Sequence, residues 1–230
     1  MKGLLLRPFR SAAAIESYYR ERVANREIRV RRQSVGICVI DDQPFAPQAN
    51  LGNYGYRIQP LGDIKTVSEI EPYDLVLCDI MGVGQHFDTK LQGASIIAEM
   101  KRCHPEKFIV AYTGAALNQV AAREAAIGAD DILKKDVDIE EWISVLDGYT
   151  STILDPKQVC QRIREDLVQR GIDTKDVLTL EDAYVSSVLS QDKTFGALRG
   201  VLKSLSLGDD VRAIVNGIVS SAAFKFILGG

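Results

Sequence analysis

Long apolar runs are missing from this sequence of 230 residues, and their absence argues against a membrane-spanning helix. The longest runs are about ten residues or fewer, whereas a helix that crosses a bilayer needs roughly 20. In the basic start MKGLLLRPFR, the apolar stretch is only Leu4-Leu5-Leu6, which is too short for the core of a secretory signal peptide. We therefore expect no contact with a membrane.

Cysteine and histidine are scarce as well. The four cysteines form no C-x-x-C pair, and Cys38 and Cys78 lie within apolar, strand-like runs. His86 and His104 have no partners at metal-ligand spacing. We interpret the cysteines as small buried residues, and we expect a cytoplasmic protein.

Charge is distributed unevenly along the chain, although the whole chain carries a net charge of only -3. Residues 1–33 contain nine Lys and Arg against three Glu, residues 34–150 contain nine basic against 18 acidic residues, and residues 151–230 contain ten of each. The acidic middle argues against nucleic-acid binding by that part. The basic start could contact phosphate or an acidic partner, or it could form a solvated helix docked on the acidic part.

From residue 35 onward, short apolar runs alternate with helical patterns. The strand-like runs are Val35–Ile40, Arg57–Leu61, Leu75–Cys78, Phe108–Tyr112 and Asp131–Leu133. Helical patterns cover Ala94–Cys103, Leu117–Ile127 and Asp138–Asp147, and a short or broken helix is expected between Asp42 and Arg57. This alternation predicts an α/β fold, with a doubly wound, five-stranded parallel sheet covered by helices on both faces.

Polar side chains follow the expected strands where each one ends. The first strand ends in Asp41-Asp42, the third in Asp79, the fourth in Thr113 and Gly114, and the fifth in Lys134-Lys135. Functional groups collect at the carboxyl ends of the strands in an open parallel sheet. We therefore expect three carboxylates, a hydroxyl and an ammonium group to converge at one edge.

These groups suit a particular chemistry. Clustered carboxylates favour a hard divalent cation such as Mg²⁺, which also offsets the repulsion between adjacent Asp41 and Asp42. A carboxylate beside Mg²⁺ can attack a phosphoryl group as a nucleophile. Mg²⁺, the Lys135 ammonium group and the Thr113 hydroxyl would then stabilise the developing charge.

Residues 35–150 resemble the receiver domain of two-component response regulators. The matching segments are VIDD, LVLCDI, AYTG and GADDILKKD, in this order and each at a strand end. The resemblance implies a flavodoxin-like fold, Asp79 as the phosphoacceptor, and Asp41, Asp42, Asp79 and the backbone carbonyl of Met81 as Mg²⁺ ligands. It also implies Thr113 as the switch hydroxyl and Lys135, rather than Lys134, as the phosphate-pairing lysine.

The sequence departs from this family in four places. Asp136 replaces the usual proline after the lysine, and Ile132 replaces the aromatic residue of the fifth strand. The segment after Asp79, IMGVGQHFDTKLQG, is longer than usual, and the first helix is shortened. All five active positions are present, so we expect phosphorylation to be retained with an unconventional signalling face.

The expected function is that of a response regulator. A histidine kinase or phosphotransfer protein would phosphorylate Asp79, and this would switch protein–protein contacts; the chain would be no enzyme beyond phosphoryl transfer to, and hydrolysis from, Asp79. Two alternatives remain within the family: a DNA-binding regulator, disfavoured by the neutral residues 151–230, and a pseudo-receiver that works without phosphate. A Mg²⁺-dependent phosphohydrolase is a further alternative, disfavoured because Met81 occupies the position of its second catalytic aspartate.

We expect residues 1–33 to be a basic helical extension, residues 34–150 the receiver domain, and residues 151–230 a small all-α output or interaction domain with a protein partner. Helical patterns there lie at Asp155–Gly171 and near 180–191, 195–206 and 210–227. An apolar stripe recurs at helical spacing in the last of them: Val211, Ile214, Val215, Ile218 and Val219. We expect a homodimer through such a stripe, or contact with the receiver; a self-contained helical core is the alternative.

Overall fold

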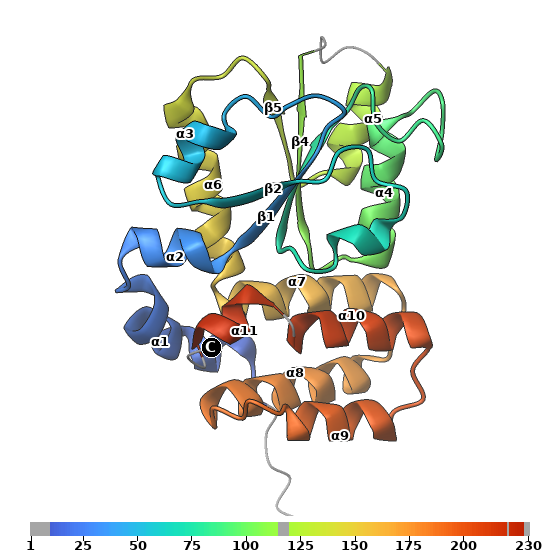
Figure 1. Cartoon of the computed structure of the whole chain (residues 1–230). Coiled ribbons are helices and arrows are strands. Elements are labelled where there is room, and N and C mark those ends of the chain that lie inside the picture. The colour runs from blue at the N-terminus through green and yellow to red at the C-terminus, as the bar shows by residue number, and fades with distance from the viewer. Residues whose placement is uncertain (1–9, 115–119, 220, 228–230) are drawn as a thin grey trace, which may run out of the picture.

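The computed structural model describes residues 10–114, 120–219 and 221–227, which form an α/β part and an adjoining helical part (Figure 1). Five strands build one parallel sheet in the order β2-β1-β3-β4-β5. Their bounds are β1 Gly36–Ile40, β2 Arg57–Pro60, β3 Leu75–Asp79, β4 Phe108–Thr113 and β5 Asp131–Lys134. Each lies within one residue of the range expected from the sequence. The strand order is that of flavodoxin-like folds, which confirms the expected fold class.

Helices cover both faces of this sheet, and β3 and β4 are therefore buried along their whole length. One face is covered by α3 (Gln48–Asn53) and α6 (Ile139–Ile153), with Leu51, Trp142 and Leu146 buried against the strands. The other is covered by the 3-10 turn η3 (Val67–Ile70), α4 (Gly93–Cys103) and α5 (Val120–Gly128). The start of the helix expected at Leu117 lies outside the described residues. The helix expected between Asp42 and Arg57 is α3, and it is short as expected, with six residues.

The helical part comprises α7 (Pro156–Gln169), α8 (Thr174–Leu189), α9 (Gly196–Ser204), α10 (Asp209–Val219) and α11 (Ala222–Ile227). Asp155 caps α7 through the Lys157 N–H, as its position before Pro156 predicts. Two expected ranges were wrong. The helix expected near 180 begins at Thr174, after the cap residue Asp173, and the run expected over 210–227 is divided into α10 and α11.

The basic N-terminal segment contacts both parts of the molecule. It contains η1 (Ala12–Ile15), α1 (Glu16–Tyr19), a turn of π-helix η2 (Arg20–Ala24) and α2 (Ile28–Ser34). Ile15 is buried in the core of the helical part, whereas Val23 is buried in the core that lies between the sheet and α6. The boundary expected at residue 150 falls within α6. The division into three segments remains a prediction.

Three residues of the apolar stripe of α10 are covered by their own chain. Val211, Ile214 and Val215 are at most 4% exposed and belong to one core with α7, α8 and α9. The side chains of Ile218 and Val219 lie outside the described ones. The self-contained helical core therefore accounts for the three described residues of the stripe, which do not support a homodimer; the homodimer stays a prediction.

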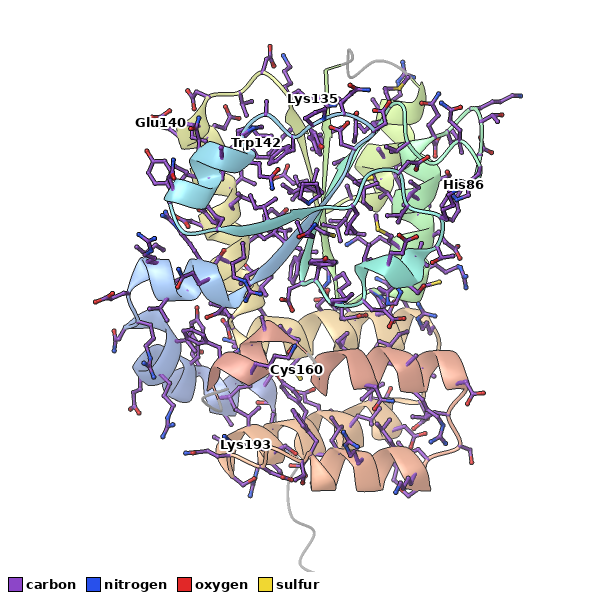
Figure 2. All side chains as sticks on the ribbon, in the orientation of Figure 1. His86, Lys135, Glu140, Trp142, Cys160 and Lys193 are labelled. Carbon is purple, nitrogen blue, oxygen red and sulfur yellow. The ribbon has the colours of Figure 1, made fainter. Side chains whose placement is uncertain are left out.

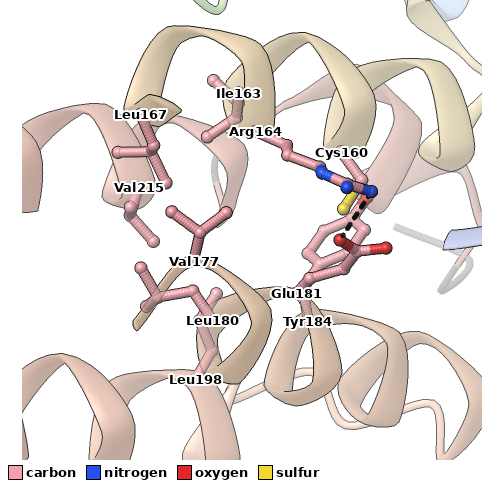
Figure 3. Close-up of a pocket in the computed structure, with 10 residues that line it drawn as sticks. All are labelled: Cys160, Ile163, Arg164, Leu167, Val177, Leu180, Glu181, Tyr184, Leu198 and Val215. Atoms are coloured by element: carbon pink, nitrogen blue, oxygen red, sulfur yellow. Dashed lines mark ion pairs between the residues drawn. The ribbon is translucent and has the colours of Figure 1, made fainter. Parts of the chain in front are cut away.

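A small cavity lies inside this helical core (Figure 3). It measures about 20 Å³, and Leu167, Val177 and Leu198 contribute to its mostly apolar lining. At its rim, Arg164 forms an ion pair with the buried Glu181 at 3.4 Å. A space of this size holds about one water molecule, whereas small-molecule sites occupy about 300 Å³ or more. This cavity is a packing defect and not a ligand site.

The helical part joins the sheet at the amino-terminal ends of the strands. Arg162 of α7 donates to both carboxylate oxygens of Asp130 at 2.8 and 3.1 Å, and to the carbonyls of Pro105 and Lys107 at 2.6 and 2.8 Å. Its guanidinium group also lies 4.3 Å from the centre of the Phe108 ring. Asp74, before β3, accepts the Ala222 N–H of α11 at 2.9 Å.

Among the described helices, none has the length and apolar character that would let it span a bilayer. All four cysteines are free, and Cys38, Cys78 and Cys160 are buried.

Candidate functional site

Three charged side chains meet at the carboxyl edge of the sheet, as the strand order predicts. The Lys135 ammonium group donates to Asp79 Oδ2 at 2.6 Å and to Asp41 Oδ2 at 2.9 Å. Asp41 and Asp79 are only 6% and 4% exposed. Lys135 follows β5 and lies at the upper edge of the molecule in Figure 2. Lys134, its neighbour, is exposed.

The two buried carboxyl groups differ in their electrostatics. Burial raises the pKa of Asp79 above its ordinary value, and the Lys135 hydrogen bond only partly offsets this. Burial acts on Asp41 as well, but hydrogen bonds from Tyr112 and Lys135 outweigh it and lower the pKa of Asp41. The pKa of Lys135 is raised, because its hydrogen bonds to Asp79 and Asp41 outweigh its own desolvation. The two carboxyl groups thus differ in the hydrogen bonds that they accept from described side chains: Asp41 accepts from both Tyr112 and Lys135, which favours its ionised form, and Asp79 accepts from Lys135 alone.

Tyr112 belongs to this site, and the sequence analysis missed it. Its hydroxyl donates to Asp41 Oδ2 at 2.6 Å, and burial followed by this hydrogen bond raises the pKa of the phenol. Phe45 and Trp142 contact its ring edge to face, at centroid distances of 5.6 and 5.8 Å. An aromatic residue inside a strand is also an ordinary core residue, so the sequence gives no signal of this role.

Asp42 completes an acidic cluster at this edge. One carboxylate oxygen from each of Asp41, Asp42 and Asp79 lies within 4.8 Å of the others, and Asp42 is the exposed member. Gly82 lies against Asp42, since a Cβ atom at Gly82 would be 2.7 Å from Asp42 Oδ1. The Met81 N–H donates to Asp79 Oδ1 at 3.2 Å, so the segment after β3 passes directly over the cluster.

Thr113 lies beside these residues. It is fully buried at the end of β4, one position beyond Tyr112, which pairs with Asp79 across the sheet. The Lys135 N–H donates to the Thr113 carbonyl at 3.0 Å. The structure thus brings all the expected site residues to one edge. Asp136 follows with a trans peptide bond, since no peptide bond of the described residues is cis.

The donor set fits a hard divalent cation. All three carboxylates provide oxygen ligands, which Mg²⁺ and Ca²⁺ prefer, and one cluster member faces solvent. One ammonium group faces three carboxylates, so negative charge remains uncompensated if all three are ionised. Asp41, Asp42, Asp79 and the Met81 carbonyl are the groups that would hold the ion.

Adding Mg²⁺ is expected to stabilise the protein. At 100 times its dissociation constant, a ligand that binds only the folded state contributes about 2.7 kcal/mol, which corresponds to about 5–10 °C in Tm for a chain of this size. Asp42→Asn should raise the Tm without metal, because it removes one repelling charge, and should suppress the shift with Mg²⁺. Differential scanning calorimetry measures both.

Asp136→Asn is the matched control, because Asp136 is an exposed aspartate next to Lys135 and outside the cluster. It should retain the wild-type shift. A wild-type Tm that does not respond to Mg²⁺ contradicts the metal site.

Comparisons with solved structures find similarity to receiver domains of response regulators. No family model and no curated protein matches the chain. A CheY-like receiver domain protein from Methanospirillum hungatei is 17% identical, with a TM-score of 0.39, over 50% of this chain and 91% of its own. The activated receiver domain of RstA from Klebsiella pneumoniae is 20% identical, with a TM-score of 0.41; the match covers 50% of this chain and 97% of the RstA domain. A response regulator from Burkholderia pseudomallei, solved with a phosphorylated aspartic acid and a calcium ion, is 20% identical, with a TM-score of 0.40, over 67% and 91%.

Proposed function

We propose that this chain is a response regulator of a two-component phosphorelay, with Asp79 as the acceptor of the phosphoryl group. The observation that carries the proposal is the buried Asp79 carboxylate on the Lys135 ammonium group, within an acidic cluster at the carboxyl ends of the strands. The donor would be a histidine kinase or a phosphotransfer protein in the cytoplasm. Phosphorylation would change the protein contacts of the helical part.

Each side chain has a defined part in this reaction. An Asp79 oxygen attacks the phosphorus atom, the bond from phosphorus to the donor atom breaks, and the donor keeps that electron pair. Lys135, already 2.6 Å from Asp79, would pair with the phosphoryl oxygens, and the Thr113 hydroxyl would donate to one of them. Asp41 stays ionised, because Lys135 and Tyr112 both donate hydrogen bonds to its carboxylate. Mg²⁺ bound at the cluster would supply positive charge to the transferring group.

Two other functions fit the sequence less well. A DNA-binding output is disfavoured because residues 151–230 carry ten basic and ten acidic residues, with no excess of positive charge. A phosphohydrolase is disfavoured because Met81 offers no second carboxylate two residues after Asp79. We therefore propose that the chain has no catalytic activity beyond transfer to Asp79 and hydrolysis from it.

Incubation with a small-molecule phosphodonor tests the proposal. With acetyl phosphate and Mg²⁺, intact-mass spectrometry should show one phosphoryl group on the protein, and a chelator should prevent its addition. Multiple rapid turnovers of the donor support the phosphohydrolase instead. A protein that remains unmodified with a Mg²⁺-dependent Tm shift supports a receiver that works without phosphate.

A further inference from the structure

The segment between β3 and α4, residues 80–92, ends in an unusual backbone conformation. Gln92 has φ +50° and ψ -123°, a region that side chains with a Cβ atom rarely adopt. The next residue, Gly93, packs so closely on β3 that a Cβ atom there would overlap the Asp79 carbonyl oxygen. The chain therefore makes a tight turn at residues 92–93, directly against the proposed phosphoacceptor strand, and glycine would be the favoured residue at position 92.

The Gln92 side chain reaches back across this segment. Its Oε1 accepts the Gly82 N–H at 2.8 Å. Gly82 itself has φ +88° and lies against the Asp42 carboxylate, where a Cβ atom would come within 2.9 Å of three carboxyl atoms. The hydrogen bond thus holds a peptide that lies against Asp42, the exposed member of the acidic cluster.

That peptide is the one that joins Met81 to Gly82. It is trans, so its carbonyl group points in the direction opposite to its N–H. Because Gln92 binds the N–H, the Met81 carbonyl is directed away from Gln92. We propose that Gln92 is a positioning residue that fixes this peptide plane and thereby presents the Met81 carbonyl to a divalent cation on Asp41, Asp42 and Asp79. This inference rests on the proposed function, which takes the Met81 carbonyl as a metal ligand.

The inference explains why glutamine occupies a position that favours glycine. Strained backbone persists where the surroundings enforce it, and it is concentrated at functional sites. Groups that orient metal ligands affect metal affinity by about 10–100-fold when they are removed. The Gln92 amide would act in this way, through a backbone carbonyl and without contact to the metal.

The experiment uses two variants that both remove the amide oxygen. Gln92→Gly relieves the backbone strain, and Gln92→Met keeps the strain and the length of the side chain. Both should lower Mg²⁺ affinity in calorimetric titration by about tenfold. Ca²⁺ affinity should fall less, because Ca²⁺ tolerates irregular geometry and Mg²⁺ requires near-ideal octahedral ligands. Exchange of the Gly82 amide proton in the metal-free protein should accelerate in both.

The melting temperature separates positioning from support of the fold. Gln92→Gly should have a Tm equal to or above that of the wild type, although its Mg²⁺ affinity is lower. If Gln92 only supported the fold, its replacement would lower the Tm and leave the Mg²⁺ affinity unchanged. Asp88→Ala is the control, because the Asp88 carboxylate accepts the Lys90 and Leu91 N–H groups of the same segment and not the Gly82 N–H.

Two failures can be told apart. If the wild type binds Mg²⁺ and both Gln92 variants bind it equally well, Gln92 does not position the site, and the proposed function stands. If the wild type binds no Mg²⁺, the metal-dependent function fails, and this inference fails with it.

Discussion

An Asp79→Asn variant is expected to accept no phosphoryl group from acetyl phosphate, even at saturating Mg²⁺. The amide has nearly the shape of the carboxylate, and its oxygen can still accept the Lys135 hydrogen bond, so the fold should persist. The amide lacks the negative charge and the basic lone pair that attack phosphorus, and this removes the reaction itself. Intact-mass spectrometry should therefore show complete loss of the modified species, the largest functional effect that we expect.

Asp88→Asn provides the matched control for this loss. Asp88 is a partly exposed aspartate in the segment after β3, where its carboxylate accepts the Lys90 and Leu91 N–H groups. Its substitution should leave the labelled fraction at the wild-type level. Equal labelling of Asp79→Asn and the wild type would contradict the assignment of Asp79 as the phosphoacceptor. Loss of labelling in Asp88→Asn would instead identify Asp88 as the acceptor.

The largest effect on stability is expected for Arg162→Met. Arg162 holds α7 on the sheet through Asp130 and the carbonyls of Pro105 and Lys107. The pair is mostly buried, with side-chain exposures of 21% and 16%. Methionine keeps contact with the Phe108 ring but leaves two carbonyls without their donor and Asp130 without its guanidinium partner.

The expected loss of unfolding free energy is about 3 kcal/mol, the lower end of the range for breaking a buried pair. Lys101 and the Ile109 N–H still bind Asp130 at 2.6 and 2.7 Å, which limits the effect. For a chain of this size the Tm should fall by about 6–12 °C. Arg102→Met is the control, because Arg102 forms a similar two-point pair with Glu99 at a 67% exposed position. Its Tm loss should be much smaller than that of Arg162→Met, because exposed ion pairs contribute little to stability; equal Tm losses contradict the role of Arg162.

The same junction should appear in the dependence of stability on pH. Burial raises the pKa of Asp130, but Arg162 and Lys101 outweigh burial and lower it below its ordinary value of about 3.9. A carboxyl group whose pKa is lower in the folded state than in the unfolded chain stabilises the protein at pH values above its unfolded-state pKa, which is this ordinary value. This contribution is lost as the pH falls through the folded-state pKa. The difference in stability between the wild type and Arg162→Met should thus shrink as the pH falls below about 4. It should not vanish, because the hydrogen bonds from Arg162 to the two carbonyls do not titrate; urea unfolding across the pH range measures this difference.

The site could be predicted from the sequence because its residues follow strands. Asp41 and Asp79 come directly after an apolar run, and Lys135 is the second residue after Ile132-Leu133. A parallel sheet brings the residues at the carboxyl ends of its strands to one edge, whatever the loops do. Tyr112 could not be predicted, since it lies inside β4 and its pairing with Asp41 spans 71 residues. Gln92 could not be predicted either, because its role depends on a backbone angle.

The helical part shows the opposite limit of sequence analysis. The spacing of Val211, Ile214 and Val215 correctly predicts one apolar face on α10. Periodicity indicates that a face is buried but not which surface covers it, and the cover proved to be the same chain. The Arg162 contact with Asp130 spans 32 residues and has no local pattern that would reveal it.

The junction through Arg162 has a consequence for which proteins can be bound at the same time. Pro105, Lys107 and Asp74 precede their strands, so the helical part adjoins one end of the sheet, whereas Lys135 and the acidic cluster lie at the other (Figures 1 and 2). None of the described helices from residue 156 onward covers the site. If the chain acts as proposed, a phosphoryl donor would dock over Asp79 while a second protein remains on the helical part. The two would then not compete for the same surface, and a three-protein assembly with this chain at its centre would be sterically open.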